Sequence, residues 1–127
     1  MKKILSILET AYRGTIEEQD DTILWLNHAI KNSGGEISIL LLGNSVNYAV
    51  KSQAVRMLSL GNSIQIRPPE VDQDLAKMMG KGIPVYLAEE DLRARGLAEA
   101  EFISGVEKIS RGELPALFKQ YDQIWYW

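Results

Sequence analysis

Residues 37–42 (ISILLL) form a nearly continuous aliphatic run, with Gly34 and Gly35 shortly before it and Gly43 directly after it. The run lacks the regular polar alternation of a strand that has one face in water. Strands of this kind are typical of parallel sheets whose two faces are both covered by helices. The run therefore predicts a central strand of an α/β protein.

The rest of the chain alternates strand and helix signals. Further apolar stretches predict strands at residues 3–8, 83–87, 106–109 and 124–127. Residues 62–70 predict a loop or a short edge strand because they contain two prolines. A helical turn is expected at residues 90–95. Helices are also expected to begin at the capping residues Thr15, Asn44 and Ser110, and a short helix at Asp72. Residues 1–127 therefore predict a single domain, a three-layer α/β/α sandwich with a mostly parallel five-stranded sheet.

Composition narrows the class of protein. The 127 residues carry a net charge of −3, with scattered basic residues, which argues against a dedicated nucleic-acid binder. The chain has no cysteine, which excludes disulfides, thiolate metal sites and every cysteine-nucleophile mechanism. The apolar stretch after Lys2 and Lys3 is too short for a signal peptide or a membrane span, so we expect a cytoplasmic protein.

Polar residues follow three of the predicted strands. They are Tyr12 and Arg13 after the first strand, Asn44 and Ser45 after the second, and Glu89, Glu90 and Asp91 after the third. The carboxyl ends of parallel strands meet at one edge, so these residues and Tyr48 predict a ligand-binding cleft there. A purely structural role suits the same residues: the polar pair would cap a helix, and Glu89 and Asp91 would pair with Arg93 and Arg95. Both interpretations stay open at this point.

Other kinds of site find little support in the sequence. Neither a Walker loop nor a G-x-G-x-x-G motif is present to bind phosphate, and three adjacent acids cannot all point toward one metal ion. His28, the only histidine, falls in the middle of the first predicted helix, away from the strand ends. Ser45 has no base in its local sequence. We therefore expect no metal, no cofactor and no catalytic residue.

The chain ends in Ile124-Trp125-Tyr126-Trp127. Side chains alternate along a strand, so Trp125 and Trp127 are expected on one face and Tyr126 on the other. So much aromatic surface at a terminus favours a subunit interface through the two tryptophans, although both could instead cover the core beneath a helix.

Several of these stretches resemble the DsrE/DsrF/DsrH superfamily of sulfur-relay proteins, which includes the TusB, TusC and TusD subunits. "PVYLAEEDLRARGL" followed by "ISGVEKISRGELPALFKQYDQIWYW" is most similar to the DsrH/TusB branch. "ISILLLGNSVNYAV" and "TAYRGT" are similar to the family's second strand and to the loop after its first strand. The resemblance implies the DsrE-like sandwich fold and assembly into multimers.

One departure from the family pattern bears directly on function. Active members of the DsrE branch carry sulfur as a persulfide on a cysteine just after the third strand, and the matching residue here is Ala88. Some DsrH members have another cysteine in the first helix, where this chain has apolar residues near Leu24 and Trp25. The resemblance therefore implies a non-catalytic subunit or scaffold in a hetero-oligomer with a cysteine-bearing DsrE/TusD-like subunit. The pathway would be tRNA thiolation or sulfur oxidation.

Two hypotheses from other classes remain beside this one. The first is an oligomeric small-molecule-binding protein of the same fold that uses the strand-end cleft, with copies of itself as its partners. The second is an enzyme that uses Asp or Glu as acid and base, although no acid pair can be positioned from the sequence.

Overall fold

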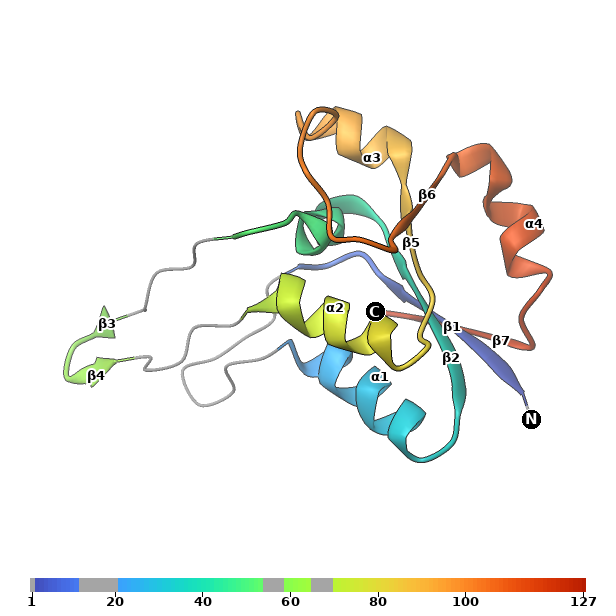
Figure 1. The fold of residues 1–127 in the computed structure, drawn as a ribbon, viewed down its shortest axis with the longest axis horizontal. Helices are drawn as coiled ribbons and strands as arrows, with labels where there is room; N and C mark the ends of the chain where they lie inside the picture. The colour runs from blue at the N-terminus through green and yellow to red at the C-terminus, as the bar shows by residue number, and fades with distance from the viewer. Residues whose placement is uncertain (1, 12–20, 54–58, 65–69) are drawn as a thin grey trace.

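A parallel five-stranded sheet forms the centre of the molecule, shown by a computed structural model that describes residues 2–11, 21–53, 59–64 and 70–127 (Figure 1). The strands are β1 (Lys3–Leu8), β2 (Glu36–Leu41), β5 (Val85–Ala88), β6 (Glu107–Ile109) and β7 (Gln123–Tyr126). They lie in the order β6-β5-β2-β1-β7, and every neighbouring pair is parallel. The α/β class and the five-stranded sheet predicted from the sequence are confirmed.

The aliphatic run at residues 37–42 occupies the centre of this sheet. β2 pairs with β1 on one side and with β5 on the other, and Ile39, Leu40 and Leu41 have no exposed surface. Ile39 and Leu41 belong to one core cluster and Leu40 to a second cluster on the opposite face. Burial on both faces explains why this strand lacks polar alternation.

Helices cover both faces of the sheet and make three layers (Figure 1). On one face, α1 (Thr22–Asn32) and α2 (Val71–Gly80) contribute Leu24, Leu75 and Met78 to the larger core cluster. On the other, the 3₁₀ helix η2 (Arg111–Glu113) leads into α4 (Leu114–Phe118), whose Leu114 and Leu117 pack on the second cluster. The short α3 (Glu89–Ala94) continues directly from β5.

The long helix predicted after the second strand is wrong. A 3₁₀ helix, η1 (Gly43–Ala49), takes its place, and Val50 then forms an isolated antiparallel bridge with Phe102. Ser52 has a φ of 60°, and the Gln53 amide donates to the Asn47 and Val50 carbonyls, so the local hydrogen bonds differ from those of an α-helix. Leu58, the last apolar residue of that pattern, lies outside the described residues.

A small hairpin follows, and its second strand lies within residues 62–70, where a loop or short edge strand was predicted, although residues 65–69 lie outside the described residues. β3 (Ser59–Leu60) and β4 (Ser63–Ile64) pair with each other and not with the main sheet. All six residues from 59 to 64 are exposed, and in Figure 1 the hairpin lies at one end of the molecule, away from the sheet.

The predicted capping residues are only partly correct. Thr15 and Glu18 lie outside the described residues, whereas α1 is capped by Asp21, whose Oδ1 accepts the N–H groups of Ile23 and Leu24 at 2.9 and 3.1 Å. The cap positions of the other helices carry no side-chain capping bond: Leu42 precedes η1, Glu70 precedes α2, and Ser110 precedes η2. Asn44 and Asp72 therefore do not occupy the cap positions predicted for them. Ser110 does, but its Oγ donates to the Glu113 carboxylate at 3.2 Å and not to a backbone group.

Candidate functional site

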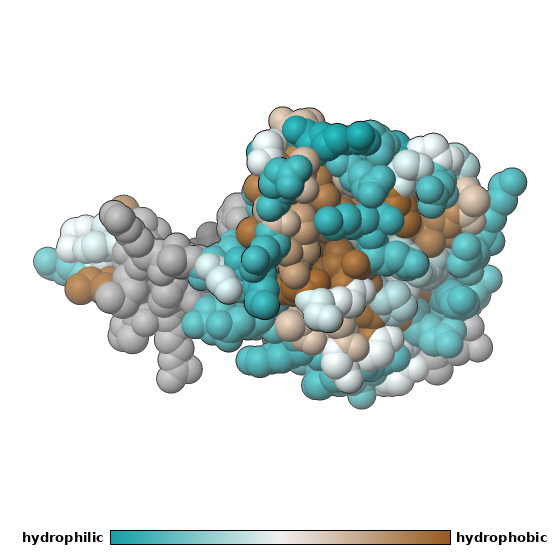
Figure 2. All heavy atoms as spheres, turned by 45° about the horizontal axis from the view of Figure 1, so that its top comes forward, coloured by the Kyte–Doolittle hydropathy of each residue, from teal (hydrophilic) through white to brown (hydrophobic). Residues whose placement is uncertain are grey.

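The carboxyl ends of the five strands meet at one edge of the sheet, where α3 and η1 also lie (Figure 1). Figure 2 brings this end toward the viewer and shows mostly hydrophilic side chains with hydrophobic surface between them. The sequence predicted a cleft here, and the structure brings several of the predicted residues together at this edge.

Asp91 is the centre of this strand-end cluster. It is 6% exposed, and its two carboxylate oxygens accept bonds from Arg111 Nε at 3.0 Å and Arg111 Nη2 at 2.8 Å. Oδ2 also accepts the Gly43 N–H at 2.8 Å. A bidentate arginine and a backbone donor satisfy a buried carboxylate well. Asp91 thus ties together the segments that follow β2, β5 and β6.

The electrostatics of this pair agree with its geometry. Burial on its own would raise the pKa of the Asp91 carboxyl, but hydrogen bonds from Arg111 and Gly43, together with the positive charges of Arg111 and Arg95, hold it below its ordinary value of 3.8. The bond to Asp91 in turn raises the pKa of the Arg111 guanidinium. Asp91 is therefore an ionised structural anchor, which differs from the protonatable carboxyl that a general acid needs.

The other charged side chains of the cluster bond to backbone groups or to a neutral amide. Glu90 accepts the Arg111 backbone N–H at 2.6 Å, and Arg95 donates through Nε to Asn44 Oδ1 at 2.9 Å. The predicted pairs of Glu89 with Arg93 and of Asp91 with Arg95 are wrong. Arg93 Nη2 instead lies 3.8 Å from Glu90, and the Asp91 carboxylate pairs with Arg111, while Arg95 Nη1 donates to the backbone carbonyl of Asp91 at 3.2 Å. Glu89 is exposed.

Ser45 and Tyr48 are buried structural residues. Ser45 has no exposed surface, and its Oγ lies 2.5 Å from the Leu8 carbonyl oxygen and 2.8 Å from that of Leu42, which links the ends of β1 and β2. The hydroxyl of Tyr48, also fully buried, donates to Asp21 Oδ2 at 2.5 Å. Neither hydroxyl faces a cleft. Tyr12 and Arg13, the other predicted cleft residues, lie outside the described residues.

Ala88, which the sequence analysis matched to the persulfide cysteine of the DsrE branch, is fully buried at the end of β5. It belongs to the core cluster on the α4 face, together with Leu42, Leu114 and Leu117. The methyl group fills a packed position beneath α4.

The carboxyl end of β7 also lies at this edge. The Tyr126 hydroxyl donates to a carboxylate oxygen of Glu9, directly after β1. Sequence analysis missed Arg111, Glu9 and Tyr126 as members of the cluster. Their position in the strand topology could have predicted them. Each lies at or just beyond the carboxyl end of a strand, and in a parallel sheet these ends meet at one edge.

The two tryptophans lie on the same face of β7, as predicted, but both are partly buried. Their rings meet edge to face at a centroid distance of 6.4 Å, and Trp127 packs against the larger core cluster and donates through Nε1 to Ser6 Oγ at 3.0 Å. The more exposed side chains of this strand are Tyr126 at 65% and Ile124 at 41%, on the opposite face. An interface role for Trp125 and Trp127 stays a prediction.

Nowhere in the described ranges do three His, Cys, Asp or Glu side chains group closely enough to hold a metal ion. No helix among them has both the length and the apolar character that crossing a bilayer requires.

Comparison with known proteins extends the fold assignment. No family model and no curated protein sequence matches the chain. Several solved structures resemble it, including the following three. The ychN protein from E. coli matches over 100% of both chains, with 22% identity and a TM-score of 0.75. MTH1491 from Methanobacterium thermoautotrophicum has 16% identity over 98% of each chain, with a TM-score of 0.64. BT1422 from Bacteroides thetaiotaomicron has 21% identity over 98% of this chain and 95% of its own, with the same TM-score of 0.64.

The MTH1491 and BT1422 structures are described as proteins of unknown function. At such identities the likeness shows the fold alone. This chain therefore has the α/β fold of the ychN protein along its whole length.

Proposed function

We propose that this chain is a non-catalytic subunit of a sulfur-relay hetero-oligomer, in which it contacts a cysteine-bearing subunit of the same fold. The observation that carries the proposal is Ala88. The residue that matches the family's persulfide cysteine is a buried alanine, and the sequence contains no cysteine at any position. Sulfane sulfur is carried on a thiolate sulfur, so this chain would act through protein contacts.

The strand-end cluster supports a structural role over a ligand-binding one. Asp91, Arg111, Glu90 and Arg95 bond to one another or to nearby backbone, and Ser45 donates to backbone carbonyls. A polar ligand at this edge would have to replace several of these bonds, each with a net value of about 0.5–1.5 kcal/mol or more where a charge takes part. The alternative of a ligand site made from these residues is therefore the weaker one.

Purification from the native cell tests this proposal. The tagged chain is expected to recover a cysteine-containing relative of similar size in stoichiometric amount, and intact-mass measurement of the complex identifies it. A homo-oligomer that lacks such a relative and retains a small molecule would contradict the proposal and favour the ligand-binding alternative.

A further inference from the structure

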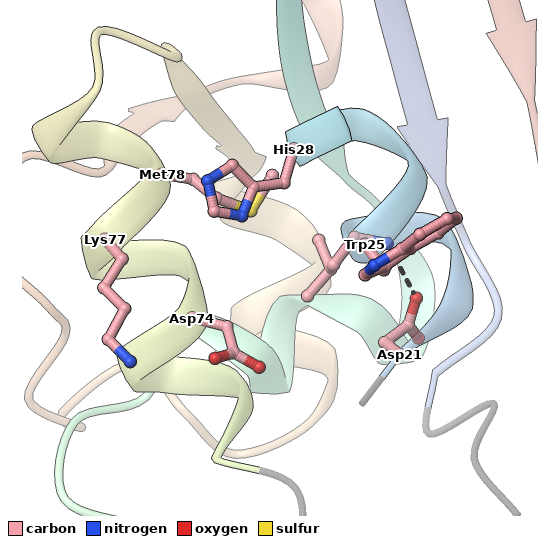
Figure 3. A pocket seen from close by; sticks show the side chains of 7 residues that line it. Asp21, Trp25, His28, Asp74, Lys77 and Met78 are labelled. Atoms are coloured by element: carbon pink, nitrogen blue, oxygen red, sulfur yellow. Dashed lines mark hydrogen bonds between the residues drawn. The ribbon is translucent and has the colours of Figure 1, made fainter. Parts of the chain in front are cut away.

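A hollow of about 160 Å³ lies between α1 and α2, in the helical layer that covers one face of the sheet (Figure 3). Its floor is apolar and includes Leu24 and Met78, and both side chains are almost fully buried. Trp25 and His28 line it from α1, and Asp74 and Lys77 from α2. A concave apolar surface with a few convergent polar groups is the usual form of a small-ligand site.

Trp25 is the most unusual residue of the hollow. Its indole is 63% exposed, although large aromatic side chains normally bury most of their area. Of the aromatic side chains, indole attracts a cation over its face most strongly. An exposed indole at the wall of a hollow is therefore suited to a positively charged group that also has apolar surface.

The charges around the hollow favour a cation as well. Two carboxylates, Asp21 and Asp74, and one ammonium group, that of Lys77, line it. In Figure 3 the Asp74 carboxylate points into the space between the two helices, toward the helix that carries Trp25. Asp21 caps α1 and accepts the Tyr48 hydroxyl, and it lies below Trp25 in the view of Figure 3. An anion would meet two like charges here, whereas a cation would meet one.

His28 adds a second polar wall. Its Nε2 is buried and has no hydrogen-bond partner in the described part of the chain, and its ring lies beside Met78 (Figure 3). Buried polar atoms without partners are uncommon in folded proteins. A rotation of the imidazole about its Cβ–Cγ bond would let this nitrogen accept a hydrogen bond from a donor group of a ligand in the hollow.

From these observations we infer that the hollow binds a small organic cation, an alkylammonium with a short apolar chain. The carbon chain lies on Leu24 and Met78, and the ammonium group lies between the face of Trp25 and the carboxylate of Asp74. This inference goes beyond the proposed function, because it places a ligand in the helical layer, away from the Asp91 cluster, and does not depend on a sulfur-relay partner.

The size of the hollow limits the ligand. A cavity of about 150 Å³ holds a molecule of the size of benzene, whereas pockets for drug-sized ligands have volumes of about 300–1,000 Å³. A linear amine with about six non-hydrogen atoms, such as 1,4-diaminobutane, therefore suits the hollow. This diamine is the probe for the test.

NMR titration of the whole chain tests the inference, because His28 is the only histidine and its imidazole signals report on the hollow alone. We expect 1,4-diaminobutane to shift the His28 imidazole and Trp25 indole signals saturably, with a Kd of about 1 mM or tighter. Succinate and 1,4-butanediol, similar in length but anionic and neutral, should leave both signals in place. An equal response to either control, or no saturable response to the diamine, would overturn the inference.

Two charge variants sharpen the test because they predict opposite changes. Asp74→Asn should weaken diamine binding by about tenfold through loss of the ion pair, and Lys77→Met should strengthen it by removing a like charge. Glu99→Gln and Lys119→Met change exposed charges elsewhere and should leave the Kd unchanged. If Lys77→Met and Lys119→Met had the same effect, the cation would not be bound at this hollow.

Discussion

At the scale of single residues, Asp91 joins three segments that are distant in the sequence. Its carboxylate accepts bonds from Arg111, which follows β6, and from the backbone of Gly43, which follows β2. Sequence analysis placed Asp91 at the correct edge but paired it with Arg95, because local spacing can only indicate partners within one helix. Arg111 is twenty residues further along, and only the strand topology brings it near.

Loss of Arg111 should leave Asp91 as an unpaired buried carboxylate. Arg111→Met is therefore expected to lower the free energy of unfolding by about 1–3 kcal/mol in urea denaturation. Arg93→Met is the matched control. The Arg93 side chain is 66% exposed and lies 3.8 Å from Glu90, so its loss should change the free energy by about 0.5 kcal/mol or less. Equal effects of the two variants would contradict an anchoring role for Asp91.

The lowered pKa of Asp91 predicts a specific dependence of stability on pH. The pKa is below 3.8 in the folded protein, so the stabilisation by this carboxylate is complete above the unfolded-state pKa and is lost as the pH falls through the folded-state value. The difference in unfolding free energy between the parent protein and Asp91→Asn should be constant near neutral pH and shrink below about pH 4. Urea titrations across this range measure it, and a difference that grew with acid would show the opposite sign.

Gly43 is the other residue on which the strand-end geometry depends. Its φ is 57°, and a Cβ atom there would lie 3.0 Å from Glu9 Cγ. Gly43→Ala should therefore destabilise the protein by about 1–3 kcal/mol. Gly61 has a similar φ of 58° with nothing within 4 Å, so Gly61→Ala isolates the backbone cost and should be milder. Thermal unfolding compares the two, and a milder effect at Gly43 would contradict the close contact with Glu9.

At the scale of elements, the strands could be predicted and the helix after β2 could not. β2 is buried on both faces, and its nearly continuous run of aliphatic residues predicts that burial directly. The helical spacing of Val46 and Ala49 is real, but the backbone is already extended at Val50, and the Gln53 amide donates to the carbonyls of Asn47 and Val50. Such side-chain bonds to backbone carbonyls compete with helix propensity and are invisible to apolar periodicity.

β7 is the element on which the predicted subunit interface can be tested. It is an edge strand with no charged residue, and Ile124 is 41% exposed on it. If the terminus is a subunit interface, Ile124→Asp and Trp125→Ser should each weaken the oligomer, measured as a lower mass by gel filtration with light scattering. Lys119→Asp, just after α4, is the control for added negative charge. An unchanged mass in both β7 variants would argue against the interface.

At the scale of the whole molecule, the fold can be assigned without assigning a function. The chain shares its architecture with the ychN protein over its full length at 22% identity, and this fold alone specifies no chemistry. The candidate site was predictable in part: Ala88, Asn44 and Asp91 lie at the expected edge. The hollow between α1 and α2 was missed because His28 and Lys77 belong to helices that are far apart in the sequence, and only their packing brings them together.

The most direct test of the proposed role is intact-mass spectrometry of the native complex while it is supplied with a sulfur donor. The account predicts that the cysteine-bearing subunit gains sulfur during turnover, and that this chain keeps its unmodified mass throughout. A covalent sulfur adduct on this chain, or transfer that proceeds equally well without it, would contradict the account.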